Sequence, residues 1–469
     1  AMIQRSYWQY CQASNCKVVG STRQQSGQAL VYGLFMLMAG VAALYFLFNV
    51  GQLTQEKTKL VNTSDAVAYS AGIMHARAMN YMAYTNRAMV ADEVTIAQAV
   101  SLASWGKYLE EHGQSAMSLG CNPENYYISE PAVEMMLRYA PICSILGTAA
   151  QAEAITTNFT QGILGAIVIA AETSKKILQL SQAVVKTSIW TVRASVMQEV
   201  ADANYAGDGD VTVEFIPIRD MFMSVGNTPS FIKEYKAQER TRMREFEVDV
   251  VNKDGFTPLR SWSDRALVVS CVFDGVYFNK VTRDGGTQLI GFDEWRAADQ
   301  ASYHRWRLET PKDSLPSCDE TDTSLGKGNQ RASTTGTTDV ESDNWEYSGV
   351  PSYFDLTEEG LAKIDPRVQF AIRVYRKADQ TRTSDGRSAI RTTPRLNRYT
   401  NGVGGDIGSG GKAYVGLAAS ETFFERPTER GDGKKELASL FNPYWQTHLM
   451  EVPSGARQQA MLEKGVVLP

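Results

Sequence analysis

The residues of this sequence with the greatest chemical potential are its histidines and cysteines. The four histidines are His75, His112, His304 and His448, and none lies at a metal-ligand spacing from another histidine or from a cysteine. The chain has no Cys-x-x-Cys pair, which disfavours a zinc site. We therefore predict structural histidines, with no metal site and no cofactor.

The six cysteines lie on both sides of a long apolar segment, with Cys11 and Cys16 before it. The four that follow it are Cys121, Cys143, Cys271 and Cys318. In an oxidising compartment these four allow three sets of pairings. Proximity along the chain favours Cys121–Cys143 and Cys271–Cys318, and each bridge would stabilise the fold by about 3 kcal/mol.

Familiar catalytic motifs are missing from the sequence. The glycine-rich stretch Gly402–Lys412 is close to a phosphate loop, but Asp406 stands where the motif needs glycine and Ala413 replaces the hydroxyl that binds Mg²⁺. A Gly-x-Ser-x-Gly nucleophile elbow is absent as well. A flexible loop is the better interpretation of the stretch, and we predict no catalytic residue and no enzyme.

Aromatic residues are frequent in the second half of the chain. They are Trp262, Trp295, Trp306, Trp345, Tyr347, Tyr353, Phe354, Tyr444 and Trp445. Burial in a core or an interface is the default for such residues, and a sugar-binding face is the alternative. The net charge of −5 argues against a nucleic-acid partner, which would require a basic surface.

The element around which the chain is organised is the apolar segment Ala29–Val50. It has no charged residue, and as a helix it would extend over roughly 33 Å, enough to cross a bilayer. The residues before it include Arg5, Lys17 and Arg23 but no acid, which predicts a cytoplasmic N-terminal segment and an extracytoplasmic remainder. A cleaved signal peptide is the alternative, but the apolar run is long and no small-residue cleavage site follows it.

The distribution of prolines divides the rest of the chain. The first proline is Pro123, so one helix could extend from residue 28 to 112 over roughly 125 Å, and further helices are predicted up to residue 204. A stripe at helical spacing runs along the first of them. It consists of Ala66, Tyr69, Ile73, Arg77, Tyr81, Tyr84, Ala88, Ala91 and Thr95. Its small residues would allow close helix approach, as in pilin-like or bundled stalks, or the stripe could simply be core packing against a second helix.

After a linker at residues 204–210, the pattern predicts a mixture of strands and short helices. Strands are expected at 211–218, 266–273, 276–282, 287–292, 368–375 and 413–419. Helices are expected at 229–250 and 436–450. A long surface loop is expected at 313–344, because that stretch is rich in Ser, Thr, Asp and Gly.

The stretch Gln24–Tyr32, the apolar segment after it, and the alanine-rich Asn62–Gly72 form a distinctive combination. Together they resemble TadE/TadG-like proteins of bacterial tight-adherence (Flp-type) pilus systems, over about residues 20–100. Leu440–Gln446 is similar to a segment of such proteins too. The resemblance implies one helix in the inner membrane, an extracytoplasmic region, and partners among pilus or envelope assembly proteins and further copies of the chain.

Two features depart from the pattern of that family. In its cleaved members a glycine precedes the scissile bond and a glutamate is the fifth mature residue. Gly27 and Gln28 would flank the bond here, but Tyr32 occupies the fifth position. The TadG-like branch, which keeps its leader and stays anchored, therefore fits better. The metal-binding Asp-x-Ser-x-Ser of some members of that branch is absent.

These observations lead to one main hypothesis, an α+β structural protein of the bacterial envelope. Residues 1–28 would be cytoplasmic, 29–50 a membrane helix in contact with lipid, 51–204 a helical stalk or hairpin, and 211–469 a mixed α/β extracytoplasmic domain. A membrane-anchored envelope enzyme or carbohydrate-binding protein on a helical stalk is the second hypothesis. A sensor ranks last, because some 28 cytoplasmic residues are too few for a signalling domain.

Overall fold

The computed structural model describes most of the chain. The described residues are 7–8, 19–20, 28–116, 130–216, 222, 230–271, 277–310, 315–377, 382–383, 386–387 and 413–458. Two very long helices and two antiparallel sheets account for most of them. The structure therefore confirms the α+β fold, with an apolar N-terminal helix that continues into a helical stalk followed by a sheet-rich region.

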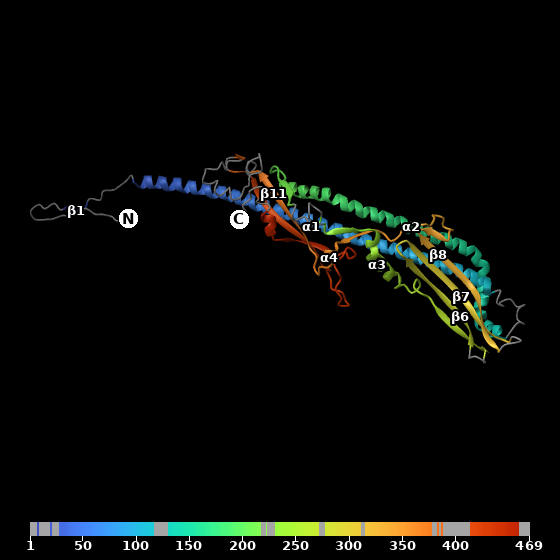
Figure 1. Ribbon diagram of the computed structural model, residues 1–469. Helices are drawn as coiled ribbons and strands as arrows, with labels where there is room; N and C mark the ends of the chain where they lie inside the picture. The colour runs from blue at the N-terminus through green and yellow to red at the C-terminus, as the bar shows by residue number, and fades with distance from the viewer. Residues whose placement is uncertain are drawn as a thin grey trace, which may run out of the picture.

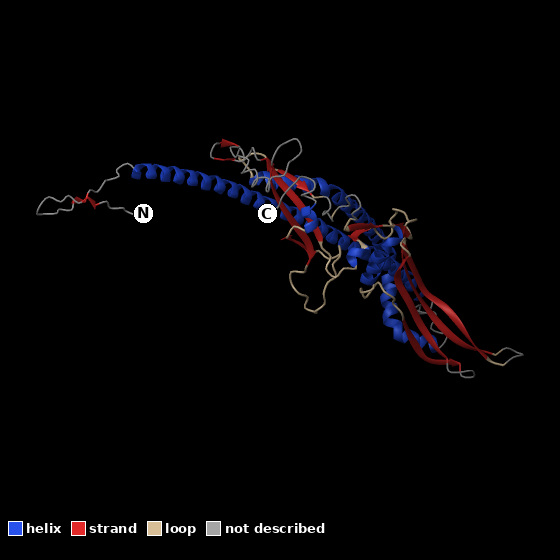
Figure 2. Cartoon of the chain, turned by 60° about the vertical axis from the view of Figure 1, so that its left-hand side comes forward, coloured by secondary structure: helices blue, strands red, loops and turns tan. Residues whose placement is uncertain are grey.

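Helix α1 (Gln28–Ala116) has 89 residues and no proline, and at 1.5 Å per residue it is about 134 Å long. Helix α2 (Glu130–Asn204) has 75 residues and runs alongside α1 (Figure 1). Figure 2 shows the first part of α1 projecting beyond the remainder of the molecule as a bare, gently curved helix. The long uninterrupted helix is confirmed, and within the described residues the stalk is the pair of helices α1 and α2, as in the predicted hairpin.

Polar contacts between buried side chains fix how the two helices are aligned. Gln182 of α2 donates to Thr85 Oγ1 and Asn86 Oδ1 of α1 at 2.6 and 2.7 Å. Towards the other end of α2, the guanidinium of Arg193 lies 2.7 Å from a ring nitrogen of His75. Since α2 residue numbers rise as those of α1 fall, the pair is antiparallel.

The predicted stripe does not face α2. Tyr69, Tyr81 and Tyr84 are exposed, while the α1 residues that contact α2 lie on another side of the helix. Packing of the stripe against a second helix of the same chain is therefore wrong. The sequence pattern found a real helical face, but it is an outer face of this chain.

The larger sheet lies along the C-terminal part of α1. Its strands are β5 (Trp262–Cys271), β6 (Tyr277–Ile290), β7 (Glu294–Glu309), β8 (Ser317–Ser333) and β9 (Asn344–Glu346), in that spatial order. All neighbours are antiparallel except β8 and β9. One face of this sheet, through residues such as Trp295 and Ala297, packs on Val100 and Ala103 of α1.

The second sheet has the order β15-β14-β11-β3 and packs nearer the apolar N-terminal part of α1. Its strands are β3 (Thr212–Phe215), β11 (Val368–Lys377), β14 (Ala413–Phe424) and β15 (Trp445–Met450). Phe370 and Ile372 of β11 pack on Val67 and Ala71 of α1 and on Ala201 of α2. Both sheets thus use the stalk helices as part of their core.

Short elements join the two sheets. A separate antiparallel pair is formed by β4 (Ile232–Tyr235) and β10 (Tyr353–Leu356). The 3-10 helix η4 (Ala237–Arg240) leads into α3 (Thr241–Val251), and α4 (Glu358–Leu361) follows β10. Two further pairs consist of two-residue strands and do not join the sheets. Before α1, β1 (Tyr7–Trp8) pairs with β2 (Val19–Gly20), and between β11 and β14, β12 (Arg382–Thr383) pairs with β13 (Gly386–Arg387).

Several expected elements have different identities in the structure. The stretch 313–344, expected to be a loop, contains the 17-residue strand β8. The expected helix at 229–250 is β4 followed by η4 and α3, and the one at 436–450 is strand β15 preceded by turns. Of the stretch 287–292, residues 287–290 end β6 and 291–292 lie in the turn after it, so there is no separate strand here. The strands predicted to begin near 266, 276, 368 and 413 are confirmed.

Glycine in β8 explains how that strand reaches the helix. A Cβ added at Gly328 would lie 1.9 Å from the carbonyl oxygen of Ser104 and 2.4 Å from the backbone nitrogen of Tyr108. Both atoms belong to the backbone of α1, so they cannot move aside without shifting the helix. We expect Gly328→Ala to lower the free energy of unfolding by about 1–3 kcal/mol through overpacking.

A matched control lies on α1 itself. A Cβ added at Gly106 meets no atom within 4 Å, so Gly106→Ala should raise stability by up to about 1 kcal/mol through helix propensity. Chemical denaturation of the two variants measures the difference. If Gly328→Ala were as stable as Gly106→Ala, β8 would not pack this tightly on α1.

Candidate membrane surface and buried ion cluster

The most unusual surface of the molecule is the first part of α1. Its large apolar side chains between Leu30 and Val50 are exposed, with Leu30 at 79% and Met36 at 75% of full exposure. Within the described residues this is the one helix long and apolar enough to cross a membrane, and none of that apolar window is buried. Since exposed apolar area costs about 25 cal/mol per Å², lipid or another apolar surface must cover it.

At the end of the apolar segment, polar side chains begin, and they donate hydrogen bonds to backbone carbonyls of α1. Asn49 Nδ2 donates to the carbonyl of Tyr45 at 2.9 Å, and Thr54 Oγ1 donates to that of Val50 at 2.8 Å. The first acidic residue, Glu56, accepts from Arg376 of β11 at 2.6 Å. The folded part of the molecule therefore begins within about two turns of the apolar segment.

Further along the stalk, a buried lysine joins α1 to α2. Lys175 Nζ donates to Glu93 Oε1 at 2.6 Å, to Glu172 Oε1 at 2.5 Å and to the carbonyl of Gly349 at 3.0 Å. Lys175 and Glu93 are fully buried. Burial lowers the pKa of Lys175, but the two carboxylates more than offset that effect, so its pKa is raised and the ammonium is retained.

The same cluster holds the larger sheet against the helices. The second oxygen of Glu93 accepts from Trp295 Nε1 of β7 at 2.7 Å and from Tyr347 Oη at 2.9 Å. Glu172 Oε2 accepts from the backbone nitrogen of Ser348 at 2.9 Å. One buried ion cluster thus ties together α1, α2, β7 and the chain after β9.

Helix α3 adds a carboxyl group of a different kind. Glu247 is fully buried, and neither of its side-chain oxygens has a hydrogen-bond partner within the described part of the chain. Burial and, to a smaller extent, the charge of Glu93 raise the pKa of Glu247 well above its usual range. The folded protein therefore favours the neutral, protonated form of this side chain.

The protonated carboxyl of Glu247 gives a prediction with a definite sign. Its folded pKa exceeds its unfolded pKa of about 4.5, so its contribution to stability is complete below the unfolded value and is lost as the pH rises towards the folded value. Over that interval the wild type should lose about 1.4 kcal/mol per pH unit relative to Glu247→Gln, which cannot ionise. Denaturation curves from pH 5 upward measure this difference.

A neighbouring glutamate on the same helix provides the control. Glu245 is exposed, so Glu245→Gln should leave the pH dependence of unfolding close to that of the wild type. Parallel stability curves for the wild type and Glu247→Gln would contradict a buried, protonated Glu247.

A second cluster was not foreseen from the sequence. On the outer face of the larger sheet, His304 Nδ1 of β7 lies 3.0 Å from Glu320 Oε1, and Asp322 of β8 is opposite His304. The other ring nitrogen lies 2.9 Å from the hydroxyl of Thr282. One atom from each of His304, Glu320 and Asp322 could contact a metal ion, but polar contacts of the histidine ring with two exposed carboxylates account for the same arrangement. Their distance in the sequence concealed this cross-strand proximity.

Two of the cysteines of the predicted disulfide bridges, Cys271 and Cys318, lie in the larger sheet. Cys318 of β8 is disulfide-bonded, and Cys271 ends β5, with β6 and β7 between the two strands. The side chain of Cys271 lies outside the described residues, so Cys271–Cys318 stays a prediction. Cys121 and the side chain of Cys143 lie outside the described residues, so Cys121–Cys143 stays a prediction.

Some of the other predicted features lie outside the described residues, and others lie in the core. Gly27 lies outside the described residues and Gln28 is the first residue of α1, so processing between them stays a prediction. The glycine-rich stretch 402–412 also lies outside the described residues. Among the aromatic residues, Trp295, Trp345 and Trp445 are buried in the core.

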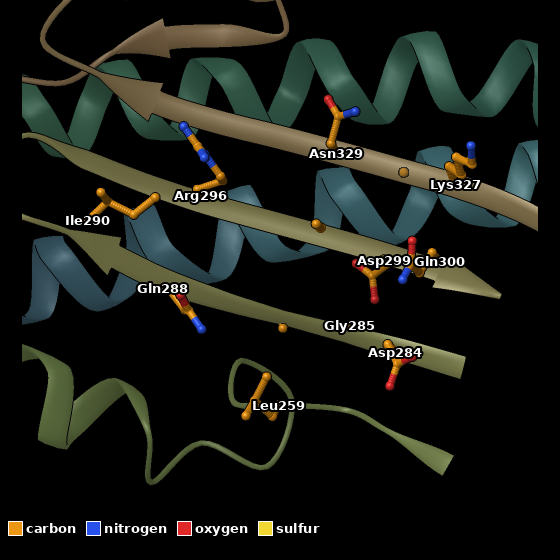
Figure 3. A pocket seen from close by; sticks show the side chains of 13 residues that line it. Leu259, Asp284, Gly285, Gln288, Ile290, Arg296, Asp299, Gln300, Lys327 and Asn329 are labelled. Carbon is orange, nitrogen blue, oxygen red and sulfur yellow. The ribbon is translucent and has the colours of Figure 1, made fainter. Parts of the chain in front are cut away.

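Two open hollows mark the surface of the sheet region. One, of about 420 Å³, lies over β6, β7 and β8 and is lined by polar side chains such as Gln288, Gln300 and Lys327 (Figure 3). The other, of about 680 Å³, lies beside Arg430 and Glu436. Neither of these two is lined by tryptophan or tyrosine, so they give no support to the alternative of an aromatic sugar-binding face.

A comparison with protein families gives a match for the N-terminal part of the chain. Residues 27–79 match the family described as putative Flp pilus-assembly TadE/G-like. The match covers the exposed apolar helix and the first turns of α1 that pack on the second sheet, which confirms the resemblance for that segment. Comparisons with curated proteins and with solved structures give no match.

Proposed function

We propose that this protein is a non-enzymatic structural component of a bacterial Flp/Tad-type pilus or a related envelope assembly. The observation that carries the proposal is the fully exposed apolar helix within a segment that matches the TadE/G-like family. The helix would anchor the chain in the inner membrane or pack it into a filament. The two sheets and the stalk would then serve for assembly with other pilus proteins and with further copies.

The orientation follows from charge. The residues before α1 contain three basic residues and no acid, which favours a cytoplasmic N-terminal segment and a periplasmic or extracellular remainder. An oxidising compartment also suits a disulfide-bonded Cys318. Tyr32 at the fifth position after Gly27, where cleaved members have glutamate, supports the TadG-like arrangement, in which the bond between Gly27 and Gln28 stays intact.

Membrane fractionation with protease protection tests this proposal. In spheroplasts of cells that express the full chain, the protein should remain with the inner membrane after an alkaline carbonate wash. Added protease should degrade residues 60–469 and spare a tag on the N-terminus. Recovery of residues 60–469 in the cytosol, intact and soluble, would refute the proposal.

A further inference from the structure

The helix pair presents two outer faces made largely of uncharged side chains. On α1, Tyr81, Tyr84, Ala88 and Ala91 form what we call the tyrosine face, and Tyr84 is 63% exposed. These residues belong to the helical stripe of the sequence, which no described part of the chain covers. Tyrosine is enriched in protein interfaces, because its ring supplies contact area at little entropic cost.

On α2, Ile177, Leu180 and Val184 form what we call the aliphatic face. Their side chains are 61%, 66% and 54% exposed. The stretch from Ile177 to Val184 contains no charged residue. Three large aliphatic side chains on one exposed helix face, at spacings of three and four, are typical of a surface that another helix covers.

The two faces lie on opposite sides of the helix pair. Asn86 of α1 and Gln182 of α2 contact each other across the helix interface at 2.7 Å. Tyr84 is two residues from Asn86, and both Leu180 and Val184 are two residues from Gln182. Two residues correspond to a rotation of about 200°, so each face points away from the other helix.

The two faces also lie at the same height along the stalk. Because Gln182 bonds to Asn86, Tyr84 and Val184 are within one turn of the same level. The ion pair between Lys175 and Glu93 fixes the register again further along, beside Ile177 and Ala91. The tyrosine face therefore spans the same level of the antiparallel pair as the aliphatic face.

We infer that the tyrosine face of one copy packs against the aliphatic face of a second copy. This rests on the proposed function, because copies anchored by residues 29–50 in one membrane cannot shift along its normal, so surfaces at equal height meet. Since the faces are on opposite sides, each copy contacts one neighbour on either side. Such head-to-tail contacts build a row or a ring rather than a closed dimer.

Charge favours this pairing over contact between two tyrosine faces. The exposed Arg77 and Arg87 border the tyrosine face, so two such faces in contact would bring like charges together. The aliphatic face has no charge of its own, and Lys176 at its border is already paired with Glu346 at 2.9 Å, so the tyrosine face meets no unpaired like charge there. The occupant that fits each face is therefore the opposite face of a second copy of this chain.

Photo-cross-linking in the membrane tests the inference. A benzoyl-phenylalanine placed at position 84 of the full-length chain, co-expressed with a second copy that carries a different tag, should cross-link to the peptide spanning 177–186 of that copy. Leu180→Glu in the second copy should reduce the yield at least tenfold. Thermal melting should be unchanged, because Leu180 is exposed.

A probe at position 259, where the native leucine is 78% exposed on the sheet region, serves as the control and should not cross-link to α2. Leu259→Glu should likewise leave the yield from position 84 unchanged. If the protein is in the membrane but position 84 cross-links to no second copy, or only to another protein, the inference is wrong while the proposed function stands. Absence of the protein from the membrane would overturn both.

Discussion

Lys175→Met should lower the free energy of unfolding by about 3–5 kcal/mol. The methionine fills much of the same volume, but Glu93 and Glu172 would then face each other in the core without a cation. Removing one partner of a buried ion cluster leaves charges that neither water nor protein compensates. Chemical denaturation of the detergent-solubilised protein at neutral pH measures the loss.

The adjacent lysine makes an unusually close control. Lys176 also pairs with a glutamate, Glu346, at 2.9 Å, but its side chain is half exposed. An exposed ion pair contributes about 0–1 kcal/mol, so Lys176→Met should be nearly neutral. Equal stability of the two variants would mean that the cluster around Lys175 is open to water, contrary to its burial in the structure.

The helices were predictable because their signals are local. Absence of proline over a long stretch and apolar residues at helical spacing are visible without knowledge of the fold, and α1 follows them from Gln28 to Ala116. That the exposed apolar segment could cross a membrane follows from its length and composition. The sequence also identified the stripe that contains Tyr81 and Tyr84, but it could not show whether a helix of the same chain covers it.

The missed strand β8 has a tertiary cause. Its serines, threonines and glycines indicate a loop, yet Gly326 and Gly328 permit the close approach of α1, whose residues His112 and Tyr108 lie against them. A strand of small polar residues is stable here because β7 pairs with it along its whole length. Glycines that serve packing look like glycines that serve flexibility until the neighbouring helix is known.

The buried ion cluster was equally hidden, although a weak signal exists. Glu93 lies between Val90 and Ile96 at a position where the helical pattern places core residues, and a charge there predicts a buried partner. The partner, Lys175, is 82 residues away on α2. Pairings over such distances depend on helix register, which one sequence does not specify.

Two arginines within the apolar segment should release the chain from the membrane. Leu37→Arg and Val41→Arg lie near the middle of residues 29–50, where each arginine costs about 2.5–3.5 kcal/mol of insertion free energy. In the structure both side chains are exposed, at 65% and 59%, so the fold of the stalk and sheets should be unaffected. We expect the double variant to move from the carbonate-washed membrane fraction to the soluble or aggregated fraction. The wild-type protein should remain in the washed membranes.

The matched control places the same two arginines elsewhere on the surface. Leu259→Arg with Leu315→Arg alters two leucines that are 78% and 88% exposed in the sheet region, and this chain should remain in the membrane. If the variant with arginines at 37 and 41 stayed in the washed membranes as firmly as the control, contact with another protein rather than lipid would hold the chain there. In that case lipid contact would not account for the exposure of this segment within the described part of the chain.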